Sequence, residues 1–286
     1  MAVITNTTVT TDVAPAISID VVSRLSASIR ALQELLNITD PIPMAEGSTV
    51  NLLGASVGTL GTQAAEGDEV GLTKVTLTST PITMTLTPYR KLVTAQAIQK
   101  VGRERAIYDT DRALIGAVRK AVKDSFYTAL TATGGGTTTS AATLQALLAN
   151  AWATLHTNFE EFDIEPVHFV NPATVAGYLG TASITTQSAF GFDYVENFLG
   201  LGTVIFAPSI TANKVVSTAK ENLRCAYVPA NGAVGQEFEM TSDESGLVGI
   251  THGRALDRFS IETLLMTGVK FFPENIAKVY TGTISA

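Results

Sequence analysis

Charged residues are scarce in this chain. Asp, Glu, Lys and Arg account for 16% of the 286 residues, whereas soluble domains average about 25%. The mean hydropathy is +0.25, yet no apolar run approaches the ~18 residues that a membrane-spanning helix needs. We therefore expect much of the apolar surface to be hidden in contacts between subunits, and we predict no membrane partner.

Negatively charged side chains outnumber positively charged ones, and the formal net charge is −7. Proteins with a general nucleic-acid-binding surface are usually basic, so this balance argues against one. A locally basic face stays open, because seven cationic residues lie close together in the sequence: Lys100, Arg103, Arg105, Arg112, Arg119, Lys120 and Lys123.

Cysteine is almost absent. Cys225 is the only one, which excludes an internal disulfide and a cysteine-based metal site. We expect a buried, inert thiol, and this composition suits a reducing cytoplasm. Residues 1–15 also lack the basic start and the apolar centre of a signal peptide.

The motifs of common enzymes are missing as well. None of the histidines His156, His168 and His252 has a second histidine or a cysteine at metal-ligand spacing. There is no Gly-x-Ser-x-Gly elbow and no phosphate-binding loop, since residues 134–136 (Gly-Gly-Gly) lack a following Lys and indicate a flexible turn. We predict no catalytic, cofactor-binding or metal-binding residues and no cofactor.

The remaining polar candidates have structural interpretations. His168 lies in an apolar segment and is expected to be a hydrogen-bonded core imidazole. Asp109 and Asp111 fall in the first turns of a predicted helix, where acidic side chains offset the helix dipole. Four acidic residues also lie close together in the sequence and predict a solvated loop: Glu160, Glu161, Asp163 and Glu165.

The residues from Thr73 to Thr87 show the clearest pattern in the chain, because apolar residues and threonines alternate almost without exception. The phase reverses at residues 79–81, so Val75 and Leu77 belong to one register and Ile82 begins the other. A period of two indicates an extended strand with one covered face, and threonine is a strand former suited to the solvent-exposed face.

The segment before this strand, residues 44–71, is rich in Gly, Thr and Ser, so we predict that both segments form a long β-hairpin. Two strands alone bury too little surface to be stable in water, and their edges invite pairing with another chain. The apolar side of the hairpin therefore needs a cover, which we expect to be another copy of the same chain.

Periodicity predicts four helices. Residues 1–17 have no period and predict an extended arm, whereas residues 18–37 carry apolar residues at helical spacing, starting from a Ser18 cap. That helix packs either on its own core or on another subunit or a partner protein. A helix over 103–131 would be ~40 Å long, and shorter helices are predicted over 141–157 and 173–179.

The rest of the chain predicts strands, with no internal repeat. The predicted strands lie at 166–170, 202–207, 214–218, 224–228, 236–242, 247–253, 257–267 and 276–283.

The order of these parts resembles the major capsid proteins of tailed bacteriophages, which share the Hong Kong ninety-seven fold. The parts are an arm, an amphipathic helix, Ala45-Glu46-Gly47 opening a Gly/Thr-rich hairpin, and the long helix at 103–131. The apolar-Asn-Pro segment from Val167 to Thr174 is similar too, as is Phe206-Ala207-Pro208-Ser209 followed by the strands of 236–283. The resemblance covers nearly the whole chain and depends on the order of the parts.

The resemblance implies an α+β capsid fold with an N-terminal arm, an extended β-hairpin loop, a long spine helix, and peripheral and axial domains. It divides the chain into residues 1–39 (arm and helix), 40–95 (extended loop), 96–150 (peripheral domain with the spine helix), 151–235 (axial domain) and 236–286 (returning strands of the peripheral domain).

The function implied by the resemblance is that of a major capsid protein of the virion, assembled in the bacterial host cytoplasm. Such proteins form hexamers and pentamers of themselves and build an icosahedral shell, first as a procapsid, around double-stranded DNA that they bind without sequence specificity. The expected partners are a portal and a scaffolding protein. Because no long helical leader precedes the arm, scaffolding would come from a separate protein, or a leader has been removed.

Some relatives crosslink their shells through Lys–Asn isopeptide bonds. Lys74 lies in the predicted loop, but nothing in the sequence identifies an acceptor, so the sequence does not predict a crosslink.

Three alternatives to a phage head protein stay open. An encapsulin has the same fold and encloses a cargo enzyme; the prominent arm and long loop favour a phage protein instead. A phage tail or decoration protein would also be rich in threonine and strands, but the long central helix argues against it. An enzyme of α+β type stays open because catalytic groups can converge from distant positions.

Overall fold

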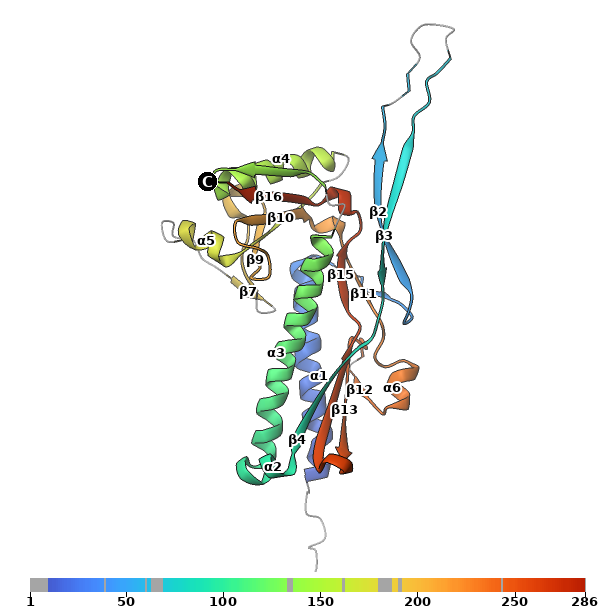
Figure 1. The fold of residues 1–286 in the computed structure, drawn as a ribbon, viewed down its shortest axis with the longest axis vertical. Helices are drawn as coiled ribbons and strands as arrows, with labels where there is room; N and C mark the ends of the chain where they lie inside the picture. Colours follow the sequence, from blue (N-terminus) through green and yellow to red (C-terminus); the bar gives the residue numbers. More distant parts are fainter. Residues whose placement is uncertain are drawn as a thin grey trace, which may run out of the picture.

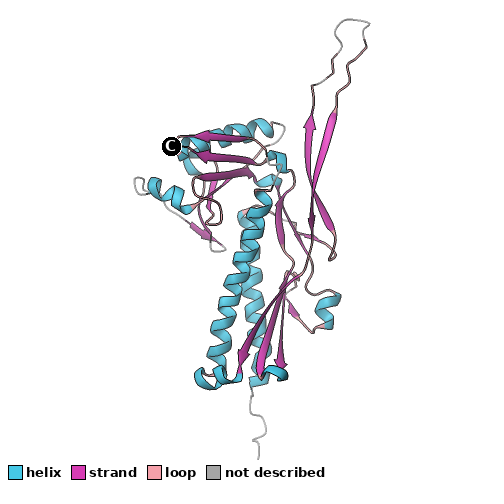
Figure 2. Cartoon of the chain, viewed as in Figure 1, coloured by secondary structure: helices cyan, strands magenta, loops and turns pink. Residues whose placement is uncertain are grey.

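The computed structural model describes residues 10–38, 40–59, 61–62, 69–132, 136–160, 163–179, 187–189, 192–242 and 244–285. Two long helices lie side by side along the longest axis of the molecule, a small antiparallel sheet runs beside them, a larger sheet lies at one end, and a thin hairpin projects past that end (Figure 1). The mixture of helices and strands confirms the predicted α+β class (Figure 2).

Helix α1 (Thr10–Leu35) is longer than the sequence predicts. The prediction of an extended arm is wrong for residues 10–17, which belong to the helix, so Ser18 is not its cap; residues 1–9 lie outside the described part. Once a helix has nucleated, each added residue gains a hydrogen bond, which favours the longer helix. The apolar row that includes Leu25, Ile29 and Leu32 is fully buried in the chain's own core.

Helix α3 (Arg103–Leu130) confirms the predicted long helix. It follows strand β4 (Thr87–Thr94) and the short helix α2 (Ala95–Val101), whose first turn is capped by the Thr94 hydroxyl. The chain then reverses at Gly102, whose φ of +91° is a conformation that other residues rarely adopt. In the core beside α3, the ring of Phe126 lies edge-on to Phe169, with centroids 5.4 Å apart.

The sheet beside the long helices is antiparallel in the order β12-β13-β14-β4, with β12 at Thr241–Ser242, β13 at Val248–Ala255 and β14 at Ser260–Thr267. Two predictions need correction here. The strand expected at 236–242 is mostly the short helix α6 (Ala233–Glu237), and the strand expected from 257 is preceded by the 3₁₀ turn η3 (Leu256–Arg258).

A three-stranded sheet connects the two ends of the molecule in the order β1-β11-β15. Its strands are β1 (Ile42–Pro43), β11 (Leu223–Tyr227) and β15 (Lys270–Pro273). Strand β15 lies against α3, where the ring of Phe271 is 5.9 Å from that of Phe126.

The larger sheet has seven strands in the order β5-β16-β10-β6-β9-β8-β7, and helices α4 (Leu144–Asn158) and α5 (Pro172–Leu179) lie on it (Figure 1). The strands are β5 (Thr138–Ala141), β6 (Pro166–Val170), β7 (Gln187–Ala189), β8 (Phe192–Val195), β9 (Thr203–Phe206), β10 (Lys214–Ala219) and β16 (Tyr280–Ile284). Three further 3₁₀ turns are η1 (Phe198–Gly200), η2 (Lys220–Asn222) and η4 (Ile276–Lys278).

This sheet draws strands from three of the segments into which the sequence was divided. Strand β5 precedes residue 150 and β16 follows residue 236, yet both pair within the sheet that holds β6 to β10. The strands after residue 236 therefore do not all return to one sheet, because β13 and β14 pair beside the long helices while β16 pairs with β10.

Candidate interaction surfaces

The predicted hairpin is present as β2 (Thr49–Val57) and β3 (Val75–Thr83), paired antiparallel from Thr49–Thr83 to Val57–Val75. Its base packs on the chain's own body. Met84 and Leu86 are buried and Ile82 is half-buried, in a cluster with Phe272 and Ile276. The second register of the alternating segment therefore faces the core.

The distal half of the hairpin is not covered by its own chain (Figure 1). The exposed fractions are 59% for Val70, 95% for Leu72, 56% for Val75 and 68% for Leu77. Val75 and Leu77, the apolar residues of the first register, are thus exposed to solvent, and so are Val70 and Leu72 in the segment that precedes β3. The ribbon does not fold back onto its own globule, which is the arrangement that the sequence predicts.

The two backbones stay close beyond the ends of β2 and β3. The Gly58 N–H donates to the Lys74 carbonyl at 2.8 Å, and the Gly61 N–H donates to the Thr73 hydroxyl at 2.8 Å. A Cβ at Gly61 would overlap the carbonyl of Gly71, so this close approach requires glycine. The hairpin therefore keeps its pairing well away from the body.

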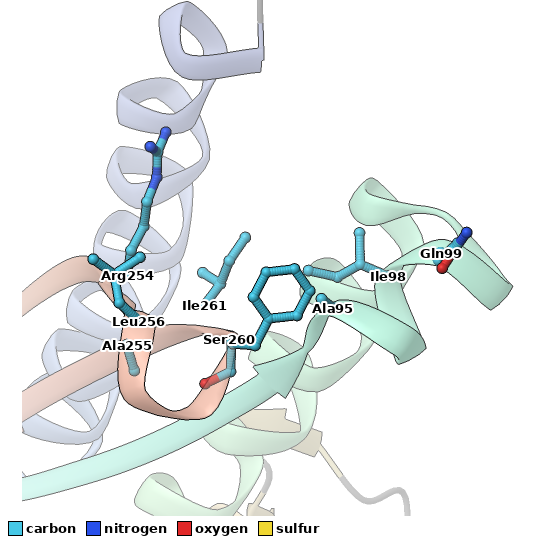
Figure 3. A pocket seen from close by; sticks show the side chains of 9 residues that line it. Ala95, Ile98, Gln99, Arg254, Ala255, Leu256, Ser260 and Ile261 are labelled. Atoms are coloured by element: carbon cyan, nitrogen blue, oxygen red, sulfur yellow. The ribbon is translucent and has the colours of Figure 1, made fainter.

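A second exposed apolar surface lies where the turn between β13 and β14 meets α2. We call it the tip patch. It surrounds a hollow of about 300 Å³. In Figure 3 the Ile98 side chain points from α2 toward Ile261 of β14. Leu256 is 84% exposed and Phe259 75% exposed beside the hollow. The sequence does not indicate this surface, because its residues follow no single period.

The three histidines occupy separate structural positions. His168 is fully buried in β6; its Nδ1 lies 2.8 Å from the Ser217 hydroxyl, and its Nε2 lies 3.1 Å from the Leu201 carbonyl. Burial lowers the pKa of His168 to about 4, against a smaller opposing effect of the Leu201 carbonyl. A buried, hydrogen-bonded imidazole is the role that the sequence predicts for it. His156 contacts the Trp152 ring on α4, and His252 bonds Thr263.

The thiol of Cys225 is buried, as predicted. Desolvation by burial raises its pKa to about 12, and a hydrogen bond from the Gln33 side chain partly opposes that rise. A thiol that stays protonated is a poor nucleophile and a poor metal ligand.

The two acidic residues early in α3 have different roles. Asp109 lies at the surface, 3.7 Å from Arg105. Asp111 is buried and forms an ion pair with Lys91 of β4. The Lys91 ammonium also donates to the Ile107 carbonyl at 3.1 Å and to the Thr110 hydroxyl at 2.6 Å. For Asp111 the helix-dipole interpretation is therefore incomplete, because this residue joins the strand to the helix.

The described cationic side chains of 100–123 lie in different environments. Lys120 lies 3.9 Å from Asp124. Arg119 is half-buried and donates to the Arg24 carbonyl at 3.4 Å, and desolvation lowers its pKa. Desolvation also lowers the pKa of Lys123, with a smaller contribution from Arg119. Several of these charges are therefore used within the subunit.

The structure describes only part of the glycine run at 134–136 and of the acidic segment at 160–165. A Cβ at Gly136 would overlap the carbonyl of Ala277, so this glycine allows close backbone packing. Glu165 pairs with Lys220 at 2.7 Å. Gly134, Gly135 and Glu161 lie outside the described residues.

Within the described ranges, no group of three or more His, Cys, Asp or Glu side chains is arranged to hold a metal ion. In the same part of the chain, no helix has the length and apolar character needed to cross a membrane.

No family model matches the sequence, and no curated protein matches it. The fold does match solved structures. The chain is similar to the capsid of a native GTA particle, with 11% identity and a TM-score of 0.55 over 91% of each chain. It is similar to the holo-SrpI encapsulin complex from Synechococcus elongatus, with 9% identity and a TM-score of 0.53 over 88% of this chain and 87% of that one.

A chain from Gordonia phage Cozz is similar as well, with 12% identity and a TM-score of 0.52 over 90% of this chain and 87% of that one. The match extends over nearly the whole chain in each case. This protein therefore has the capsid fold of the Hong Kong ninety-seven type, as the sequence resemblance implies.

Proposed function

We propose that this chain is a shell-forming subunit, and specifically the major capsid protein of a tailed phage. The observation that carries the proposal is the projecting hairpin, which exposes the apolar side chains of Val70, Leu72, Val75 and Leu77. A neighbouring copy that covers these side chains would remove apolar surface from water. The role is structural rather than catalytic.

The parts of the fold receive their proposed roles from this function. Helix α3 is the spine helix of a peripheral domain, the hairpin is the extended loop, and the seven-stranded sheet with α4 and α5 forms most of an axial domain. Copies would meet as hexamers and pentamers in the virion shell, after assembly in a bacterial cytoplasm with a separate scaffolding protein and a portal. The enclosed double-stranded DNA would not be bound sequence-specifically.

Shortening the hairpin tests the proposed function. Leu53 and Ser79 face each other across the ribbon, so replacing residues 54–78 with Asn-Gly would close it with a two-residue turn. We expect a soluble subunit that keeps its fold and does not form shells, because the exposed apolar side chains of the hairpin are gone. Negative-stain microscopy of the purified protein and its melting temperature are the two measurements.

A matched control keeps the hairpin but changes only exposed threonines, for example Thr76→Ser. This variant should assemble as the natural chain does. Normal particles from the shortened chain would refute the role of the hairpin.

An encapsulin-type shell is the second candidate, supported by the similarity to the SrpI encapsulin complex. The contents of purified particles separate the two candidates. A phage head from infected or induced cells would protect double-stranded DNA from nuclease, whereas an encapsulin would carry a protein cargo and no nuclease-protected genome.

A further inference from the structure

One asparagine in the chain is followed directly by glycine. Asparagine occurs throughout the sequence, but only Asn231 precedes a glycine, Gly232. The backbone nitrogen that follows an asparagine can attack the side-chain amide carbon, because the ring that forms has five members and the two groups are held close together. A side chain on the following residue hinders this attack, and glycine has none. The pair is therefore the least hindered site for this reaction in the sequence.

The pair lies in an exposed turn that leads into α6. Asn231 is exposed, and the Gly232 N–H donates to the Pro229 carbonyl across the turn. The distance of 3.3 Å is longer than the typical value of about 2.9–3.0 Å for such a bond. Local opening of a surface turn costs little free energy compared with global unfolding. The Gly232 nitrogen can therefore be released for attack while the subunit stays folded.

The side chain of Asn231 is held beside this turn. A Cβ at Gly246 would overlap the amide oxygen of Asn231, so the amide lies over a glycine whose φ is +64°. The Gly246 carbonyl also accepts a 2.7 Å hydrogen bond from the Ala230 N–H. These contacts keep the amide close to the backbone of its own turn, and the exposure of Asn231 gives water access to it.

We propose that Asn231 is a modification site, at which the folded subunit slowly converts this asparagine into aspartate and isoaspartate. The Gly232 nitrogen loses its proton to hydroxide and forms a bond to Cγ of Asn231, and the bond from Cγ to Nδ2 breaks with release of ammonia. Water then adds to either carbonyl of the resulting succinimide and opens the ring. The net change is the loss of ammonia and the gain of water, so no oxidant or reductant takes part.

Both products change the segment on which α6 is seated. Aspartate adds a negative charge to the turn, and isoaspartate adds one carbon to the main chain between Ala230 and Gly235. The backbones of these two residues are in close contact, since a Cβ at Gly235 would overlap the Ala230 carbonyl. A longer connection does not fit this contact, so isoaspartate should loosen α6.

This inference goes beyond the proposed function, because the reaction needs only the folded subunit. A chain that never forms particles would overturn the proposed function and leave the modification site unaffected.

Incubation of the folded, unassembled subunit tests the proposal. Samples taken over time are digested, and mass spectrometry detects a gain of about 1 Da and the separate elution of the isoaspartate peptide. We expect conversion at position 231 at a rate that rises with pH, because the attacking nitrogen must lose its proton. Asn213 is the internal control, since it is also exposed but precedes Lys214; it should stay unchanged.

Two variants test the mechanism. Gly232→Ala places a methyl group on the attacking residue, and the φ of −71° at this position suits alanine, so the melting temperature should change little. Its conversion should be slower by at least about tenfold, which corresponds to about 1.4 kcal/mol in the activation barrier. Asn231→Gln keeps a side-chain amide but would have to form a six-membered ring, so it should react more slowly as well.

Three outcomes would overturn the proposal, and one would support it. Conversion at residue 231 that both variants suppress is the supporting result. An unchanged Asn231 in the folded subunit, or conversion that occurs only after unfolding in urea, would overturn the proposal. Equal conversion at Asn213 would overturn it too, because the glycine that follows Asn231 would then make no difference.

Discussion

Burial sets the protonation state of two potentially reactive side chains in this fold. Histidine and cysteine often take part in catalysis, yet burial keeps the His168 imidazole uncharged and the Cys225 thiol protonated. The sequence indicates the burial of both, because each lies in an apolar strand. It does not reveal the partners, since Ser217 and Gln33 come from distant parts of the chain.

The stability of the fold should depend on His168 at mildly acidic pH. Its pKa is about 4 in the folded chain and about 6.5 when unfolded. The stabilisation from its neutral form is complete above pH ~6.5 and is lost as the pH falls toward ~4, by up to about 3 kcal/mol. Urea unfolding of the natural chain and of His168→Gln between these pH values is the measurement.

The variant removes this titration while keeping groups that can form hydrogen bonds. Its unfolding free energy should therefore fall less with acidification than that of the natural chain. Parallel pH profiles for the two proteins would contradict the prediction. Carboxylates titrate in the same range in both proteins, so only the difference between the profiles reports on the imidazole.

Among the elements, α1 resolves an alternative that the sequence leaves open. Its spacing predicts an amphipathic helix but does not say whether the apolar face covers its own core, another subunit or a partner protein. In the structure that face packs in the same cluster as Val118 and Phe126 of α3. The cover is thus supplied by an element about 90 residues further along the chain.

Truncating the buried row of α1 should therefore destabilise the isolated subunit. Ile29 is fully buried, and Ile29→Ala should cost about 2–5 kcal/mol, because it removes methyl groups and leaves a cavity. The free energy of unfolding of the unassembled subunit, from denaturant titration, measures the loss. The exposed position Ala27→Ser on the same helix is the control and should change it little. An unaffected Ile29→Ala subunit would mean that α1 does not belong to the monomer core.

The short helix α6 shows where local patterns fail. Residues 236–242 contain Phe238 and Met240 two positions apart, which predicts a strand. The structure instead places Gly235 so close to the Ala230 carbonyl that a Cβ would overlap it, and Phe238 is 54% exposed. The conformation is set by packing between backbones, which the alternation of side chains does not record.

The net charge of the whole molecule should oppose its assembly. Each subunit carries −7, so copies repel one another at low ionic strength, and salt screens this repulsion over the Debye length, which is about 30 Å at 0.01 M and about 8 Å at 0.15 M. If apolar contacts such as those of the hairpin dominate, the protein concentration needed for particles should fall as salt rises across this range. Light scattering at constant pH measures that threshold.

The opposite salt dependence, with particles dissolving as salt rises, would mean that contacts between unlike charges dominate the interfaces. An uncharged osmolyte at matched osmolality serves as the control, because it leaves electrostatic repulsion unscreened.

The amino-acid order alone determined the hairpin, the long helix α3, the buried histidine and the sequence of elements typical of a capsid fold, because each follows from periodicity or from local propensity. Only the tertiary structure decided which apolar faces are covered. Val75 and Ile82 belong to the same alternating segment, yet Val75 is exposed in the projecting ribbon and Ile82 packs against the buried cluster that contains Phe272 and Ile276. Burial depends on what lies across from a side chain, and for β16, α1 and the tip patch that neighbour comes from a distant part of the chain.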